Sequence, residues 1–159
     1  MYLIGGCQIE DRSVSDQTVE LQHKTAFIFK KANMPQGKFA HGAIACRDQI
    51  IVTGGISNLM LNMGLRSVPI GESDCYSFNI FKNKWTRLPD IPIGKLHPTL
   101  VTIQSRFIFQ IGGFDDDDAD IYRLDMLNPA RPWKTLRLDK TIQIIDNGLW
   151  LVDEANKHD

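Results

Sequence analysis

The sequence predicts an all-β fold assembled from repeated units of four short antiparallel strands. The first observation behind this prediction is a diglycine that occurs three times, each time after a run of β-branched or aromatic residues, at Gly5-Gly6, Gly54-Gly55 and Gly112-Gly113. The intervals of roughly 50 to 60 residues between them suit four strands with one loop of variable length. Units of this kind close into a β-propeller, so the chain is predicted to form part of one.

A second repeated pattern follows the second and third diglycines. The alternating run at residues 76–80 leads to Trp85, and a matching run at residues 122–126 leads to Trp133. Alternating apolar and polar residues predict a strand with one buried face, and the tryptophan then opens the next strand. The agreement between the two units predicts the third and fourth strands of each.

The first unit departs from this pattern. Val19 stands where the other units have tyrosine, and Ile28 stands where they have tryptophan. The strands predicted here cover residues 2–6, 18–22 and 26–31, and no strand corresponds to the first strand of the other units. The first unit is therefore predicted to be degenerate.

Prolines and glycines mark the boundaries between units, at residues 34–39 and 91–96. They end one outer strand and let the chain cross to the next inner strand, because proline cannot donate to a strand ladder and glycine permits a sharp change of direction. After the third unit, an Asn-Gly turn at residues 147–148 predicts a β-hairpin. The predicted organisation is an incomplete first unit at 1–35, a second unit at 36–92, a third unit at 93–140, and a terminal hairpin and tail at 141–159.

These features together resemble kelch repeats. The resemblance covers residues 1–140 and rests on the diglycine after the second strand, the tyrosine in the third strand and the tryptophan that opens the fourth. It implies a partial kelch-type β-propeller of about three four-stranded antiparallel blades, with the C-terminal hairpin beginning a further blade. The glycines would permit backbone angles closed to other residues, and the aromatic rings would pack neighbouring blades together. The residues that carry the motif are Gly5, Gly6, Gly54, Gly55, Gly112, Gly113, Tyr76, Trp85, Tyr122 and Trp133.

Composition argues against several classes of function. The 159 residues are 43% hydrophobic and 23% charged, and the net charge of -1 gives no broad basic field for nucleic acid. The apolar stretches are too short to span a bilayer, and no signal-peptide pattern is visible, so we expect a cytoplasmic or nuclear location. Three cysteines, Cys7, Cys46 and Cys75, match neither a disulfide framework nor a zinc spacing.

The predicted units are too few for a closed ring. Propellers close with typically four to eight blades, and this chain has material for about three and a half. Open strand edges and apolar blade faces favour association unless they are covered. Three explanations stay open: a fragment of a longer propeller, two copies paired through a C-terminal strand, or a place in a larger assembly. In the second and third cases, self-association or incorporation into a larger assembly would complete the propeller.

The loops at one end of the units form the predicted contact surface for a protein partner. The loops at 56–73 and 114–120 emerge on the same side as the crossovers between units. Apolar side chains of the first loop either fold back over the propeller or anchor a partner, and carboxylates of the second would steer a basic segment. The predicted partner-binding residues are Leu59, Met60, Leu61, Met63, Leu65, Arg66, Asp115, Asp116, Asp117, Asp118, Lys38 and Lys95.

No sequence pattern indicates catalysis or a cofactor. The acidic loop lacks the glycine and the terminal glutamate of an EF-hand, so a solvated loop is preferred over a calcium site. His41 and His97 lie near the starts of two predicted inner strands, but no third metal ligand accompanies them. Some enzymes with kelch propellers hold copper through two tyrosines, two histidines and a cysteine, whereas Tyr76 and Tyr122 are assigned here to packing. We predict no catalytic residue, no cofactor and no metal.

The sequence thus predicts a non-catalytic kelch-repeat module that binds proteins through its loops, as a scaffold or an adaptor does. The alternative is a structural subunit that joins a large complex through its open blade edges, and a metal-dependent kelch-type enzyme is a third, less favoured reading. Deleting the apolar part of the loop at 56–73 separates the first two, because only the first would lose its partner.

Overall fold

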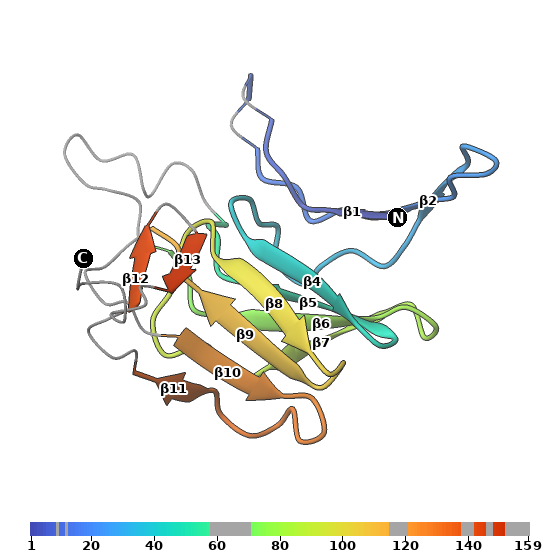
Figure 1. The fold of residues 1–159 in the computed structure, drawn as a ribbon. Coiled ribbons are helices and arrows are strands. Elements are labelled where there is room, and N and C mark those ends of the chain that lie inside the picture. The colour runs from blue at the N-terminus through green and yellow to red at the C-terminus, as the bar shows by residue number, and fades with distance from the viewer. Residues whose placement is uncertain are drawn as a thin grey trace, which may run out of the picture.

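The chain is all-β, as predicted. The computed structural model describes residues 1–137 except 9, 12, 58–70 and 115–120, together with the strands at 142–145 and 148–151. The strands form antiparallel sheets that follow one another along the chain (Figure 1). The first sheet holds β1 (Tyr2–Ile4), β2 (Thr18–Leu21) and β3 (Ile28–Lys30); the second holds β4 (Gly42–Cys46), β5 (Gln49–Thr53), β6 (Cys75–Asn79) and β7 (Lys84–Leu88); the third holds β8 (Thr99–Ile103), β9 (Phe107–Ile111), β10 (Ile121–Asp125) and β11 (Lys134–Leu136); β12 (Ile142–Ile145) and β13 (Gly148–Leu151) form a hairpin.

Each diglycine follows the end of a strand, as the sequence predicted. β1, β5 and β9 each stop directly before a diglycine, whose first glycine has a φ of 67°, 68° or 61°. Residues with a Cβ rarely adopt such angles, so glycine is needed where the chain leaves the ladder. The three strands of the first sheet likewise lie within the predicted ranges.

Each sheet has two faces, because successive side chains of a strand point to opposite sides. We call the side that carries the tyrosine and tryptophan of the second and third sheets the front face, and the opposite side the back face. In the second sheet Ile50 pairs with Phe78, Phe78 pairs with Trp85, and Val52 pairs with Tyr76. This register places these five buried side chains together on the front face of that sheet.

The front face of the second sheet packs on the back face of the first sheet. Tyr2 of β1 meets Phe78 edge to face, with 5.9 Å between the ring centroids. Ile4, Ala32 and Met34 complete the contact from the first sheet and from the chain that follows it. The result is a hydrophobic core between two neighbouring layers.

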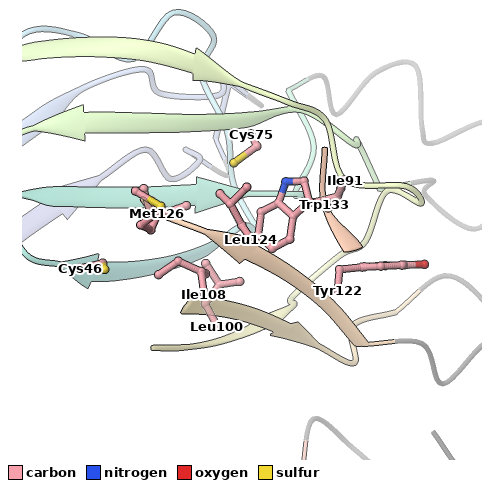
Figure 2. Packing of buried hydrophobic residues seen from close by; sticks show 10 residues of the cluster. Cys46, Cys75, Ile91, Leu100, Ile108, Tyr122, Leu124, Met126 and Trp133 are labelled. Carbon is pink, nitrogen blue, oxygen red and sulfur yellow. The ribbon is translucent and has the colours of Figure 1, made fainter. Parts of the chain in front are cut away.

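The third sheet repeats this arrangement against the second sheet. Its front face packs on the back face of the second sheet, and the buried side chains of the two layers meet in a second core (Figure 2). From the second sheet and its following turn this core contains Cys46, Ile51, Cys75 and Ile91, and from the third sheet it contains Leu100, Ile108, Tyr122, Leu124, Met126 and Trp133.

The two tryptophans also make equivalent hydrogen bonds across these layers. Trp85 Nε1 donates to the carbonyl oxygen of Ala32 at 2.9 Å, and Trp133 Nε1 donates to that of Pro89 at 3.0 Å. Each acceptor lies in the segment that leaves the preceding sheet. The indole therefore fills the core with its ring and satisfies a backbone carbonyl of the neighbouring layer.

We expect the substitution Trp85→Phe to lower the free energy of unfolding by about 1–3 kcal/mol, because it leaves the partly buried Ala32 carbonyl without its donor. Urea denaturation measures this change. Phe81→Leu is the control, since Phe81 is 85% exposed and its substitution should change stability by less than about 0.5 kcal/mol. Equal unfolding midpoints for both variants would contradict the assigned role of the indole N–H.

Candidate functional site

The diglycines, the crossovers between sheets and the loops after β5 and β9 lie at one end of the sheets. Backbone hydrogen bonds join them: the Gly6 N–H donates to the Lys38 carbonyl oxygen and the Gly55 N–H donates to the Lys95 carbonyl oxygen, each at 2.8 Å. These bonds tie the end of one sheet to the crossover that leads into the next. We call this end the loop face, comprising residues 35–40, 54–57, 71–74, 92–97 and 112–114.

Lys38 and Lys95 are buried, which corrects the expectation that they lie exposed on the predicted contact surface. Lys38 is 0% exposed, and its Nζ forms ion pairs with Glu72 and, at 2.6 Å, with Asp74 Oδ1. Lys95, at the same position of the next crossover, is 2% exposed. A buried ammonium group needs charged partners to offset lost hydration. Lys38 therefore ties loops together, and neither lysine is exposed enough to contact a partner directly.

Glu72 connects the buried lysine to both ends of the loop at 56–73. Its Oε1 accepts hydrogen bonds from the Ser57 N–H, at 2.9 Å, and from the Ser57 hydroxyl, while Oε2 pairs with Lys38. Burial alone would raise the pKa of Glu72, but the hydrogen bonds from Lys38 and Ser57 outweigh it and hold that pKa below its usual range. Glu72 therefore stays ionised at neutral pH and joins the two ends of this loop.

An open cavity of about 480 Å³ lies beside this network, and Gln36, Glu72, Asp74, Tyr76 and Arg87 contribute to its lining. The Arg87 side chain is 61% exposed at the cavity. Burial, together with the nearby Asp74 carboxylate, raises the pKa of Tyr76 to about 12. Its hydroxyl stays protonated at neutral pH and can donate a hydrogen bond. That hydroxyl is hydrogen-bonded to Asp74, and Arg87 pairs with Asp90 at 2.9 Å. The cavity therefore presents a polar wall of both charges, with the exposed Arg87 guanidinium as its cation.

Most of the sequence-predicted contact residues lie outside the described residues. Their neighbours at the loop ends are described: Ile56 is buried, whereas Phe114, just before the acidic run, is 61% exposed. The sequence-predicted residues that fall outside are Leu59, Met60, Leu61, Met63, Leu65, Arg66, Asp115, Asp116, Asp117 and Asp118.

The two histidines do not occupy equivalent positions. His41 lines a second cavity of about 350 Å³ between β1 and β4, whose other lining residues are mostly apolar. Burial and the positive charge of Lys38 lower the pKa of His41, so its ring is neutral at pH 7. His97 is exposed and has a φ of 49°, as Ala40 has a φ of 56° in the preceding crossover. Among the described residues, no three His, Cys, Asp or Glu side chains are grouped to hold a metal ion.

Glu72 and Asp74, the two carboxylates that pair with Lys38, were not among the residues predicted from the sequence. A repeated signal could have identified one of them, because an aspartate stands two residues before the tyrosine in both complete units, as Asp74 and Asp120. A lysine also follows each boundary glycine, as Lys38 and Lys95. Paired repetition of opposite charges predicts an ion pair within each repeat more directly than it predicts a partner surface.

No helix in the described part of the chain has the length and apolarity needed to cross a membrane. No family model matches the sequence. A curated relative, the tRNA wybutosine-synthesizing protein 4 of Candida albicans, is 28% identical over 119 residues. The match covers 72% of this chain and 15% of that protein, so the chain spans only a small part of its length.

Proposed function

We propose that this chain is a kelch-type repeat protein, that its sheets are propeller blades, and that it binds a protein partner through the loop face without catalysing a reaction. The proposal that the sheets are blades of a repeat protein is supported by their packing, because the front face of one sheet packs on the back face of the preceding sheet in both cases. The paired hydrogen bonds of Trp85 and Trp133 support it as well, because both indoles bridge successive sheets in the same way.

The observation that carries the binding role is the open cavity on the loop face. Glu72 and Asp74 place carboxylates at its wall, and Gln36 and Arg87 are exposed beside them. Buried ion pairs beneath this surface fix the loop ends, so little ordering remains to be done when a partner binds. A surface with both charges suits a polar peptide segment, whereas nucleic acid would require a predominantly basic one.

A photocrosslinking amino acid at Gln36 tests this role in the intact chain. We expect Gln36, at the cavity, to crosslink to a specific protein in cells, and the same group at Phe81, in the β6–β7 turn at the other end of the second sheet, to leave that protein unlabelled. The purified partner should then bind Arg87→Glu at least tenfold more weakly than Lys82→Glu. Equal binding of both variants, or crosslinking through Phe81 alone, would rule out the loop face.

A second role, that of a structural subunit, is favoured by a different observation. The first sheet exposes large apolar side chains, with Leu3 at 54% and Ile28 at 68% exposure. Contiguous apolar surface of this kind marks sites where another protein packs. The two roles use different surfaces, so one chain can perform both.

A further inference from the structure

The front face of the first sheet is equivalent to the two front faces that are buried within the chain. Leu3 stands two residues before a diglycine, as Val52 does in the second sheet. Leu3 pairs with Val19, and Leu21 pairs with Ile28, so these side chains share one face of the first sheet. They correspond in register to the residues that form the front of the second sheet.

This face is open, whereas its equivalents are covered. Leu3 is 54% exposed while Val52 is 0% exposed, and Ile28 is 68% exposed while Trp85 is 8% exposed. The first sheet lies at one end of the row of sheets, so no described sheet precedes it (Figure 1). In both packed examples, the layer that covers a front face is the back face of a sheet of the same kind.

The same chain also presents an open back face of that kind, on the third sheet. Val101 and Ile103 there are 38% and 47% exposed. They stand in β8 where Ile44 and Cys46 stand in β4, and Cys46 is 3% exposed beneath the third sheet. Phe109 and Ile111, which are half-buried, share this face with them by strand register, whereas Ile121 on the same face is 8% exposed.

We propose that the front face of the first sheet of one copy packs on the back face of the third sheet of a second copy, head to tail. The contact continues the layer packing that already exists twice within the chain. It removes exposed apolar side chains of both copies from water, which is the main driving force for association. Because the two surfaces differ, the interface is heterologous and joins copies into a ring or a chain. This proposal deepens the structural role proposed above and is independent of the loop face.

Two variants test the interface, each placing a charge on one exposed face: Leu3→Lys on the front of the first sheet and Ile103→Lys on the back of the third. Light scattering after size exclusion measures the solution mass of the unaltered chain and of each variant over a range of concentrations. The unaltered chain should exceed its monomer mass of 18.0 kDa as concentration rises. Each variant alone should remain monomeric, since an unpaired charge at the contact weakens it roughly tenfold or more. Phe81→Lys, in an exposed turn away from both faces, should behave like the unaltered chain.

An equimolar mixture of the two variants gives the decisive result. The Leu3→Lys chain keeps an intact back face on its third sheet, and the Ile103→Lys chain keeps an intact front face on its first sheet. The mixture should therefore form a dimer of about twice 18.0 kDa that neither variant forms alone. A mixture that stays monomeric would overturn the head-to-tail interface, as would an unaltered chain that is monomeric throughout. So would an Ile103→Lys variant that associates normally, because association would then not use the back face of the third sheet.

The pair Ile28→Lys and Val101→Lys repeats the test at two other exposed positions, and a circular dichroism spectrum of each variant shows that it is folded. Failure of self-association leaves the loop face untouched, because that proposal depends on crosslinking at Gln36. Loss of the Gln36 crosslink, in turn, has no effect on the mass measured here. The two proposals therefore fail on separate observations.

Discussion

Replacing Lys38 by methionine is expected to lower the free energy of unfolding by about 3–5 kcal/mol. The substitution leaves Glu72 and Asp74 without the cation that both of them contact, and uncompensated buried charge is among the most destabilising changes in proteins. Lys24→Met removes an exposed lysine and should change stability by less than about 0.5 kcal/mol. Urea denaturation at pH 7 compares the two variants with the unaltered chain.

A triple variant separates the lost ion pairs from simple loss of packing. Adding Glu72→Gln and Asp74→Asn to Lys38→Met removes the unpaired charges, so part of the lost stability should return. If the single variant unfolds within about 1 kcal/mol of the unaltered chain, the buried network is not what fixes the loop face.

Acid should weaken the same network. The folded chain holds the pKa of Glu72 below its usual range, because the hydrogen bonds from Lys38 and Ser57 outweigh burial. A depressed folded pKa adds stability that is present above the unfolded value, about 4.3, and is lost as pH falls through the folded value. The free energy of unfolding of the unaltered chain should therefore fall progressively as the pH drops below about 4.3. Lys38→Met should show a shallower slope there, and an unchanged slope would assign the acid sensitivity to other carboxylates, such as Asp125.

The strands could be predicted from the sequence because their signals are local and repeated. Thr53 ends β5 directly before Gly54, and Ile111 ends β9 directly before Gly112. The alternation from Tyr76 onwards placed β6, and Trp85 fell within β7. A period of two residues and a glycine with positive φ depend on a few neighbouring residues only, so such elements are readable without tertiary contacts.

The environment of Lys38 could not be read in the same way. A lysine beside a proline and a glycine looks like a solvated turn residue, and its burial depends on Asp74, which lies 36 residues later in the chain. Only the folded arrangement shows that a loop end closes over the ammonium group. The exposed faces of the first and third sheets were similarly hidden, because apolar alternation predicts a buried face without showing which layer covers it.

The substitution Gly94→Ala is also expected to lower the free energy of unfolding strongly, by about 3 kcal/mol or more. An added Cβ would stand 1.9 Å from the carbonyl oxygen of Gly71, a backbone atom that cannot turn aside as a flexible side chain can. The crossover would have to move away from the loop end beside Lys95, which disturbs the packing between the second and third sheets. Thermal and urea unfolding of the variant measure the cost.

Gly37 provides the matched control, because it occupies the same place in the preceding crossover. There an added Cβ would lie 2.8 Å from the Val14 carbonyl oxygen and 2.9 Å from the carbonyl group of Ser15. These overlaps are smaller than the one at Gly94, so a smaller shift relieves them, and Gly37→Ala should lower the free energy of unfolding by only about 1 kcal/mol. Gly94 should therefore be the more sensitive of the two positions. The reverse order would mean that the loop end at Gly71 yields more easily than the segment at Val14, which would contradict a firmly held loop end at the second crossover.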